Sequence, residues 1–505
     1  MIRISLTDVT AQISSQLFLK NINFEIKKEE NWAIVGANGS GKSSMGKLIC
    51  DDLQVISGEV ESPVHSEYIS FEKVIEILDA ENENDESDYM GGGGYIGTTA
   101  EQFICDADAI DKGQLQHMAT KLRFEDILGQ ELRSLSTGEM RKVVICRALL
   151  RDPEVLVLDE PFDGLDSDSC VTLKNIFASC VENGITIVLL LNRFSEILPE
   201  VTHVAYLKDC SLFTSGRKEE ILQSEALLRF HSFHYTLPAQ LPTYESGYSL
   251  VSDRTQPLIE MKNVSVRYGD KTVLYKLDWT VLPDQNWTIA GPNGSGKTTL
   301  LNLISGDNVQ AYGNDIHLFG RKKGSGESIW DIKERLGYVS SSFQQRYRVG
   351  ATAKAVIISG FFDSIGIYRK HSKLQEKIAL KWLSILSMES HKNTSFHRLS
   401  YGEQRLLLIA RAMVKQPMIL ILDEPCQGLD DANRVMVLKL IDHLGQSDKT
   451  QLLYVSHHTE DKIPCIEHIL QLVPAEGGGS TAEIFPAAAY RYGPALGYLK
   501  QQRVE

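Results

Sequence analysis

The feature that most constrains this chain is an internal repeat. Residues 31–42 read NWAIVGANGSGK and residues 286–297 read NWTIAGPNGSGK, a shift of 255 residues. Further along, the STGE of residues 136–139 returns as SYGE at residues 400–403, a shift of 264 residues. Solenoid repeats have periods of roughly 20 to 50 residues. The much longer period here predicts two duplicated domains.

Short apolar runs alternate with helical stretches in each half. Residues 155–158 and 419–422 are continuously apolar, as is typical of parallel strands buried on both faces. Residues 139–150 and 403–414 have the composition of helices. Each half also opens with alternating apolar residues, which indicates half-buried strands. The pattern predicts α/β cores with appended helical pieces.

A segment with little periodicity separates the two halves. It contains Pro238, Pro242 and Pro257 among serine, threonine, tyrosine and glycine residues. The expected organisation is a first domain over residues 1–225, a linker over 226–257, a second domain over 258–475 and a C-terminal tail over 476–505.

Charge and cysteine usage narrow the class of protein. The net charge of −14 disfavours a broad nucleic-acid footprint, because such a footprint needs a basic patch. The eight cysteines form no CxxC pair, so they are expected to be reduced thiols of a cytosolic protein and not metal ligands. No apolar run approaches the roughly 18 to 20 residues that span a bilayer, and the N-terminus does not read as a signal peptide. We expect a cytoplasmic protein, so any channel it serves would belong to another subunit.

Both glycine-rich strings match GxxxxGK[ST] in a strand–loop–helix context. Their glycines allow successive backbone amides to point at phosphate oxygens. Lys42 and Lys297 are expected to reach the β- and γ-phosphates of ATP. The hydroxyls of Ser43 and Thr298 are expected to bind Mg²⁺. The predicted phosphate-binding residues are Gly36, Asn38, Gly39, Gly41, Lys42, Ser43 and Ser44 in the first half and Gly291, Asn293, Gly294, Gly296, Lys297, Thr298 and Thr299 in the second.

An acidic pair follows each buried apolar run. Asp159 and Asp423 end the predicted strands, where parallel α/β sheets bind their ligands, and are expected to hold Mg²⁺ through water. Glu160 and Glu424 come next and suit a general base that orients the water attacking the γ-phosphate. The sequence therefore predicts ATP and Mg²⁺ as cofactors. The predicted metal-binding set is Ser43, Asp159, Thr298 and Asp423.

With these motifs the chain resembles the ABC ATPase superfamily. LSTGE at residues 135–139 and LSYGE at residues 399–403 look like the signature motif of that superfamily. The resemblance implies two P-loop NTPase domains of ABC type, each with a RecA-like α/β core, an antiparallel β piece and a helical signature subdomain. It also implies that the two domains pair head to tail within the chain, each signature contacting the γ-phosphate held by the other domain. Carried over in this way are Ser136, Gly138, Glu139, Ser400, Gly402 and Glu403 for the signatures and Asp166 and Asp430 for the domain interface.

The halves match the superfamily unequally. Tyr268 lies where its members place an adenine-stacking aromatic, and His457 lies where they place a catalytic histidine near the γ-phosphate. The first half has Ile13 and Asn192 at those positions; an asparagine can donate a hydrogen bond but cannot carry positive charge. We expect the site built on Lys297 to turn over faster, although both sites could work because each keeps its glutamate.

The loop in which the superfamily carries a phosphate-sensing glutamine departs from the pattern in both halves. The nearest candidates are Glu72 in the first half and Ser341, with Gln344 close by, in the second. A carboxylate beside triphosphate is repelled unless Mg²⁺ bridges the two. The identity of the switch residue therefore stays open in each half.

Within the superfamily, the chain is similar to the ModF-type tandem ATPases associated with molybdate transport. The strings that carry this likeness include LSTGEMRKVVICRAL, FGRKKGSGESIWDIK and ISGFFDSIGIY. The likeness implies an ATPase that energises a separate transmembrane permease from the inner face of the membrane, with molybdate or another oxyanion as cargo. The alternative is a non-transport ABC ATPase that acts as a regulator or scaffold on a macromolecular complex. Phe361, Phe362 and Tyr368 lie in the helical insert, where they could form either a docking interface or the core of that insert.

Overall fold

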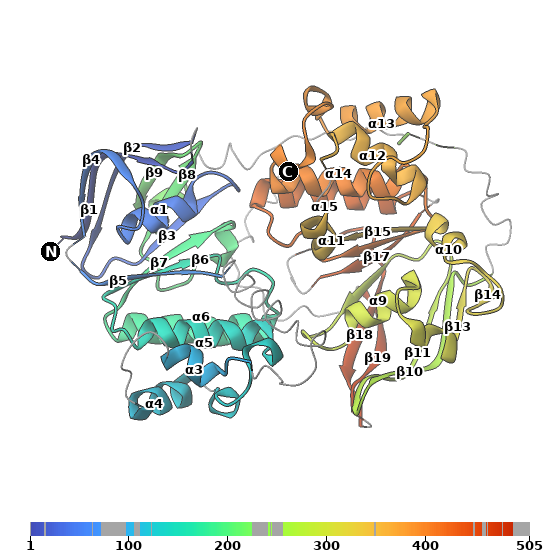
Figure 1. Ribbon diagram of the computed structural model, residues 1–505, viewed down its shortest axis with the longest axis horizontal. Coiled ribbons are helices and arrows are strands. Elements are labelled where there is room, and N and C mark those ends of the chain that lie inside the picture. Colours follow the sequence, from blue (N-terminus) through green and yellow to red (C-terminus); the bar gives the residue numbers. More distant parts are fainter. Residues whose placement is uncertain are drawn as a thin grey trace, which may run out of the picture. The chain divides into compact units, whose positions relative to one another are not determined.

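The chain forms two compact units, Met1–Phe233 and His234–Glu505. Figure 1 shows the elements of each unit in the computed structural model. The division lies inside the segment predicted as a linker. The residues that the structure describes are 2–14, 17–62, 64–71, 97–105, 112–122, 124–224, 241–242, 244, 256–347, 350–447, 450–456, 461, 463–476 and 478–487.

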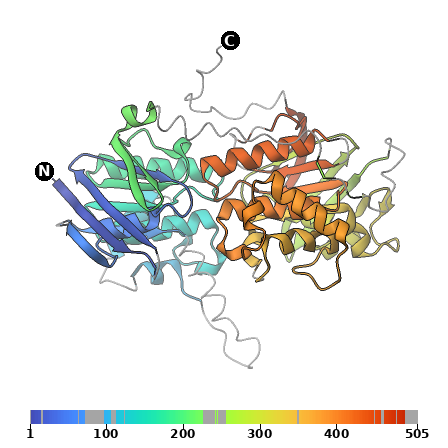
Figure 2. The same ribbon diagram turned by 90° about the horizontal axis from the view of Figure 1, so that it is seen from above.

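The first unit contains a small antiparallel sheet and a larger, mostly parallel one. The small sheet has the order β2-β1-β4, and its strands, drawn in blue, form one side of the unit in Figure 2. The larger sheet has the order β5-β6-β7-β3-β8-β9, in which β9 is the one antiparallel strand. The strands are β1 (Ile2–Gln12), β2 (Phe18–Lys27), β3 (Trp32–Gly36), β4 (Val55–Glu61), β5 (Ser66–Ser70), β6 (Val155–Asp159), β7 (Thr186–Leu191), β8 (His203–Lys208) and β9 (Ser211–Arg217).

One helix of the first unit follows the glycine-rich loop. Others form a helical insert, and the rest precede or follow β6 in the chain. The α-helices are α1 (Lys42–Ile49), α3 (Ala100–Cys105), α4 (Lys112–Leu122), α5 (Thr137–Leu149), α6 (Ser167–Glu182) and α7 (Lys218–Leu222), and the 3-10 turns are η2 (Glu125–Ile127), η3 (Leu132–Ser134) and η4 (Phe194–Glu196).

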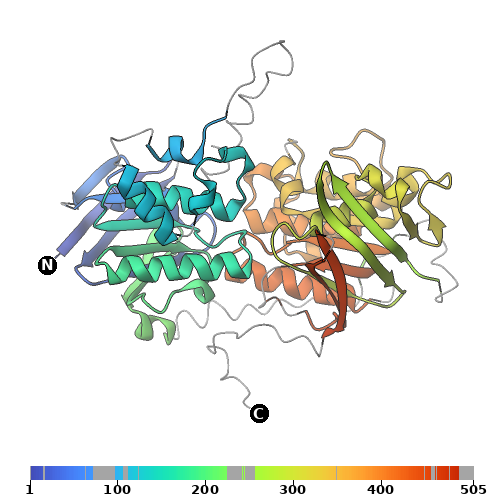
Figure 3. The same cartoon turned by 90° about the horizontal axis from the view of Figure 1, so that it is seen from below.

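The second unit repeats the same core order but joins its two sheets into one. The described strands follow the order β14-β13-β10-β11-β19-β18-β12-β17-β16-β15. A parallel pairing of Leu274 with Ser480 connects the antiparallel piece to the core, and Figure 3 shows the red β19 beside the yellow-green strands. The strands are β10 (Ile259–Tyr268), β11 (Lys271–Val281), β12 (Trp287–Ala290), β13 (Asp315–Leu318), β14 (Arg321–Lys322), β15 (Leu336–Ser340), β16 (Ile419–Asp423), β17 (Gln451–Val455), β18 (His468–Pro474) and β19 (Ser480–Pro486).

The helices of the second unit follow the same plan. The α-helices are α9 (Lys297–Ser305), α10 (Ile329–Arg335), α11 (Ser341–Arg346), α12 (Ala353–Ser359), α13 (Lys373–Ile385), α14 (Tyr401–Met413) and α15 (Asp431–Gly445), and the 3-10 turns are η5 (Val309–Gly313), η6 (Gly360–Phe362), η7 (Glu389–His391) and η8 (Phe396–Arg398).

Successive residues of the buried strands supply two different cores. In β6, Val155 and Val157 belong to the core on the α1 side, whereas Leu156 and Leu158 belong to the core that contains residues of α5 and α6. Since side chains alternate across a strand, a continuously apolar strand serves both faces of the sheet. The predicted α/β architecture with two P-loop domains is confirmed.

The sheet of the second unit extends beyond the expected end of its domain. Strand β19 lies in the segment assigned to a tail from residue 476, yet it pairs with β18 from His468 opposite Pro486 to Pro474 opposite Ser480. A hairpin made of short alternating residues after glycines gives a weak sequence signal, which is why the boundary at 475 falls before this strand. Among the described residues, no helix is both long enough and apolar enough to cross a membrane.

Candidate functional site

The two glycine-rich loops have nearly the same backbone geometry. Gly41 and Gly296 precede α1 and α9 with φ angles of 97° and 96°. A Cβ atom at Gly41 would lie 2.9 Å from Leu19 Cδ2, and one at Gly296 would lie 2.8 Å from Leu274 Cδ2. Because glycine alone adopts this conformation without strain, both positions require it. The loops can therefore present their amides to an anion at the start of a helix.

The lysine of each loop is held inside the loop. Lys42 Nζ donates to the carbonyl oxygens of Gly36 and Ala37 at 2.9 and 3.1 Å. Lys297 Nζ donates to the carbonyl oxygen of Gly291 at 2.7 Å and to that of the next residue at 2.9 Å. Both side chains are buried. Each ammonium group thus lies where a P-loop needs positive charge for phosphate oxygens.

The acidic pairs end β6 and β16, as the sequence predicts. Glu160 and Glu424 both adopt the left-handed region, with φ angles of 50° and 52°. Their amides donate to Leu190 O and Val455 O, each at 3.0 Å. A residue with a side chain pays roughly 1–3 kcal/mol for such a conformation, so the surrounding fold must enforce it. The same strained peptide in both units places the two glutamates equivalently.

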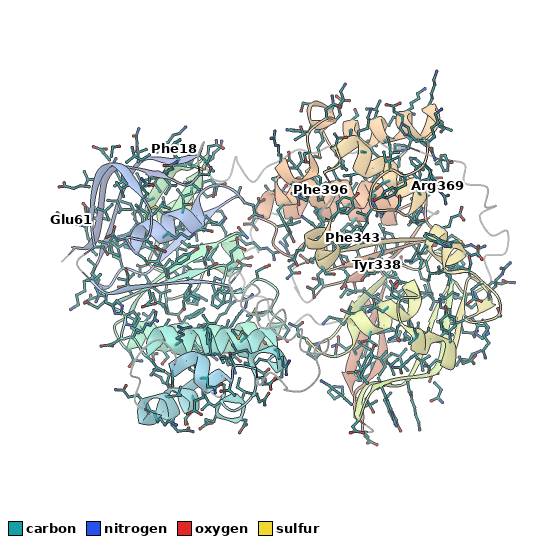
Figure 4. All side chains as sticks on the ribbon, viewed as in Figure 1. Phe18, Glu61, Tyr338, Phe343, Arg369 and Phe396 are labelled. Atoms are coloured by element: carbon teal, nitrogen blue, oxygen red, sulfur yellow. The ribbon has the colours of Figure 1, made fainter. Side chains whose placement is uncertain are left out.

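A tyrosine that the sequence analysis did not single out contacts the aspartate of each pair. Tyr68 Oη donates to Asp159 Oδ2 at 2.6 Å, and Tyr338 Oη donates to Asp423 Oδ2 at 3.4 Å. Tyr338 is labelled on β15 in Figure 4. The signal was present in the sequence, because Tyr-Ile-Ser ends β5 and Tyr-Val-Ser ends β15.

The aspartate of the first unit offers a free acceptor to a metal site. Asp159 is buried, and its Oδ1 has no hydrogen-bond partner among the described residues. A buried carboxylate oxygen without a partner is costly unless a ligand or water satisfies it. Ser43, which carries the expected hydroxyl ligand, lies in the first turn of the adjacent helix α1. A hard oxygen donor set of this kind fits Mg²⁺ with its bound waters.

Burial raises the pKa of a carboxyl group in each acidic pair. In the first unit, burial raises the pKa of Glu160 to about 8, with Asp163 and Asp159 adding to the rise and Lys42 and Asn192 opposing it. In the second unit, burial together with the nearby Glu424 raises the pKa of Asp423 to about 6. At neutral pH Glu160 is therefore protonated more often than an ordinary glutamate, and a protonated carboxyl group cannot accept a proton.

The signature motifs begin helices α5 and α14 as capping boxes. Ser136 Oγ accepts from the Glu139 amide at 3.3 Å, while Glu139 Oε2 accepts from the Ser136 amide at 2.8 Å. Ser400 and Glu403 repeat the arrangement with the same two distances. This gives both glutamates a structural role. Both serines remain exposed to solvent.

The glycines of the signature differ in how tightly they pack. A Cβ atom at Gly402 would lie 2.2 Å from Asn433 Cγ, whereas one at Gly138 would lie 3.1 Å from Ser169 Oγ. Asn433 Nδ2 in turn donates to Asp430 Oδ2 at 2.9 Å.

The two aspartates expected at a domain interface are helix caps. Asp166 Oδ1 accepts from the Ser169 amide at 2.8 Å at the start of α6, and Asp430 Oδ1 accepts from the Asn433 amide at 2.9 Å at the start of α15. Capping accounts for an aspartate at each position. Their role between domains remains a prediction.

The strand registers align the switch loops. Ser70 pairs with Asp159 and Ser340 pairs with Asp423, so Ser341 corresponds to Phe71. Glu72, the candidate from the sequence, follows that position and lies outside the described residues. Gln344 is buried, and its Nε2 donates to Tyr401 O at 3.0 Å and to Gln404 Oε1 at 3.2 Å. It therefore ties α11 to the signature helix α14.

The two units carry different residues at the predicted adenine and histidine positions. Tyr268 is 53% exposed and its hydroxyl accepts from Asn308 Nδ2 at 2.9 Å, which leaves much of the side chain open to solvent. Ile13 packs against the core instead. Asn192 is buried beside Glu160, to which it hydrogen-bonds. His457 lies outside the described residues.

The aromatic residues of the helical insert separate into two kinds. Phe361 and Phe362 pack against the core that contains α12 and α14, and the ring of Phe361 lies 4.9 Å from that of Tyr244. Tyr368 is 80% exposed. The first two residues are thus part of the insert's core, and Tyr368 alone among the three is open to a partner.

The cysteines do not add a second site. All eight are free thiols. Within the described ranges, no cluster of three or more His, Cys, Asp or Glu side chains has the geometry to hold a metal ion.

The sequence matches the ABC transporter family over residues 19–163 and 274–427. It is 42% identical to the ABC transporter ATP-binding protein ModF of Escherichia coli, over 93% of this chain and 96% of that protein. An uncharacterised ABC transporter ATP-binding protein of Schizosaccharomyces pombe is 28% identical, over 88% of this chain and 92% of its own.

Solved structures support the same fold. The RNase-L inhibitor superposes with a TM-score of 0.58 at 19% identity, covering 94% of this chain and 89% of its own. The archaeal ribosome recycling factor aABCE1, in complex with the ribosomal stalk protein aP1, superposes with a TM-score of 0.59 at 18% identity, covering 94% and 89%. At these identities the likeness concerns the fold alone.

Proposed function

This chain belongs to the ABC transporter family as a tandem ATP-binding protein, and from that premise we propose that its two units hydrolyse ATP unequally to energise a transporter. The observation that carries the proposal is the repeated placement of a buried lysine inside a glycine loop in each unit. A strand-end Asp-Glu pair accompanies each lysine.

In the proposed reaction, each loop binds the phosphates of ATP through its amides and its lysine. Lys297 leaves its carbonyl partners for the β- and γ-phosphate oxygens and stabilises the charge that develops on them. Glu424 orients the attacking water and accepts its proton. In the first unit, the raised pKa of Glu160 and the neutral Asn192 favour slower turnover.

Mg²⁺ is part of the proposal. Ser43 with Asp159, and Thr298 with Asp423, would hold it, and the unpartnered Asp159 Oδ1 supports this assignment. Bound there, the ion would supply charge neutralisation between the β- and γ-phosphates.

We also propose that each site is completed by the signature of the other unit. Ser136 and Gly138 would complete the site of Lys297, and Ser400 and Gly402 would complete the site of Lys42. The exposure of the two capping serines supports this pairing, because both helix starts are open to solvent and a helix start can bind a phosphate.

A direct test is ATP hydrolysis by the purified full chain with and without Mg²⁺. The double variant Lys42→Ala/Lys297→Ala serves as the matched control and should lose nucleotide binding. Hydrolysis that survives in the double variant would contradict the assignment of the two loops.

The transport role rests on the resemblance to ModF. We propose a protein at the cytoplasmic face that docks on a separate permease carrying molybdate or a related oxyanion. The experiment is purification of the tagged chain from membranes in mild detergent. One permease recovered in a stable ratio supports the proposal. Recovery with ribosomes or another soluble complex, and no permease, would favour the alternative of a regulator or scaffold.

A further inference from the structure

We propose that Tyr68 and Tyr338 are positioning residues for the metal-binding aspartates, and that the first unit holds its aspartate more firmly than the second. The inference rests on the proposed function, since it concerns how each aspartate meets Mg²⁺.

The two tyrosines occupy the same place in the two sheets. Tyr68 lies opposite Val157, two residues before Asp159 along the neighbouring strand, and Tyr338 lies opposite Ile421, two residues before Asp423. Residues two apart on a strand face the same side of the sheet. Each tyrosine therefore reaches along its face to the carboxylate, and the duplication keeps this relation although the intervening chain differs in length.

The tyrosine hydrogen bond engages one oxygen of the Asp159 carboxylate and leaves the other without a partner among the described residues. Tyr68 Oη donates to Asp159 Oδ2 at 2.6 Å, a short contact typical of a hydroxyl and a carboxylate. Asp159 Oδ1 has no partner among the described residues. With one oxygen fixed, the side chain can present the other in a single direction to a metal-bound water. Groups that orient a ligand in this way typically change metal affinity by roughly 10- to 100-fold.

Packing explains why the contact is longer in the second unit. A Cβ atom on Gly46 of α1 would lie 2.9 Å from Tyr68 Cε2, so the ring lies directly against the glycine backbone. The residue at the same position of α9 is Leu301, which is fully buried in the cluster against which Tyr338 packs. The larger side chain leaves less room for the ring. The resulting 3.4 Å contact is close to the limit of a hydrogen bond.

The test measures how strongly Mg²⁺ improves nucleotide binding. Calorimetry with a non-hydrolysable ATP analogue gives its Kd in Mg²⁺ and in EDTA, and the ratio of the two reports the coupling between metal and nucleotide. The full chain carrying Lys297→Ala reports the first unit, and the one carrying Lys42→Ala reports the second. Tyr68→Phe should lower the ratio about 10-fold, and Tyr338→Phe about threefold because its hydrogen bond is longer. Neither change should alter the Kd in EDTA.

Two further variants test whether an effect of Tyr68→Phe comes from its contact with Asp159. Tyr347→Phe removes another buried hydroxyl, 3.3 Å from Ser359 Oγ in the helical insert, and should leave the ratio unchanged. Gly46→Ala places a Cβ atom 2.6 Å from Leu190 Cδ1 and 2.9 Å from Tyr68 Cε2, so it crowds the Tyr68 ring without removing its hydroxyl, and should bring the first unit toward the ratio of the second.

An unchanged ratio in Tyr68→Phe and in Gly46→Ala would overturn the proposal, as would a loss in Tyr338→Phe larger than that in Tyr68→Phe. Failure of both parent chains to bind the analogue would instead contradict the proposed function.

Discussion

The two units carry the same Asp-Glu pair, but different side chains make the contacts around it. In the second unit, Ser341 Oγ donates to Glu424 O at 3.1 Å and accepts from Arg405 Nη2 at 3.1 Å. In the first, Phe71 replaces the serine and its ring lies 4.9 Å from the guanidinium of Arg141. Hydrogen bonds are directional, whereas a cation–π contact tolerates movement. In the second unit, the start of the switch loop is thus tied by a hydrogen bond to the carbonyl group of Glu424.

A second difference lies in the hydrogen bonds between the helix that follows the acidic pair and the neighbouring strand. In the second unit, buried Asp461 accepts from Arg434 Nε at 2.7 Å, from Tyr454 Oη at 2.8 Å and from Ser456 Oγ at 2.9 Å. This network joins the start of α15 to the end of β17. The first unit has Cys170 at the position of Arg434. The second unit therefore holds the start of α15 against the end of β17 through a buried carboxylate, and the first unit has no arginine at the position of Arg434 to form the same pair.

The largest expected effect comes from breaking that network. Asp461→Ala removes the carboxylate that pairs with Arg434, a side chain that is only 12% exposed. We expect a loss of about 3 kcal/mol in the stability of the second unit, since unpairing a buried charge typically costs this much. Urea unfolding measures it. Glu101→Ala in the first unit, whose contact to Lys112 Nζ joins side chains that are 43% and 86% exposed, should cost about 1 kcal/mol or less; equal costs would remove the contrast.

The signature glycines give the next largest difference. Gly402→Ala drives its Cβ into Asn433, which must then leave Asp430. Overpacking of this kind costs about 2 kcal/mol. Gly138→Ala meets only the hydroxyl of Ser169, which can rotate away, so its cost should stay below about 1 kcal/mol. Thermal unfolding of the two variants side by side is the measurement, and a larger loss from Gly138→Ala would refute the packing explanation.

The smallest expected effect is on the pH dependence of folding stability in the first unit. The pKa of Glu160 is raised by burial to about 8, above the roughly 4.3 of an exposed glutamate. Between these two values the folded state keeps a proton that the unfolded state releases, so stability falls as pH rises toward 8. Glu160→Gln should flatten this dependence and raise Tm near pH 8 by about 2–4 °C, equivalent to about 1 kcal/mol.

Melting curves of the nucleotide-free chain from pH 5 to 9 test this expectation. Glu25→Gln, which changes a carboxylate that is half exposed, is the matched control. An undiminished pH slope in Glu160→Gln would show that the buried carboxyl group does not control it.

The motifs with strong local rules were predictable from the sequence. A glycine loop before a helix, an Asp-Glu pair after an apolar run and a Ser-x-x-Glu helix start each reflect local backbone chemistry, and the structure has all three in both units. The role of Tyr68 could not be predicted with the same ease, because its partner Asp159 is 91 residues away and the corresponding separation in the second unit is 85. Such a contact depends on strand register, which sequence patterns specify only after the sheet order is known.

Strand β19 and Phe71 illustrate the same limit. The hairpin that carries β19 is specified by its pairing with β18, not by its own composition. The sequence alone suggests the charged Glu72 for the switch position, whereas the strand registers place Phe71 at the position of Ser341. Packing across the sheet decides both positions.

The central claim is that the two sites hydrolyse ATP at unequal rates. The steady-state ATPase activity of two variants tests this claim most directly. Glu424→Gln removes the proposed general base from the site built on Lys297 and should lower kcat about 100-fold. Glu160→Gln removes a group that is largely protonated at neutral pH, and should lower kcat by less than about threefold. Equal losses in the two variants, or a greater loss in Glu160→Gln, would contradict the account.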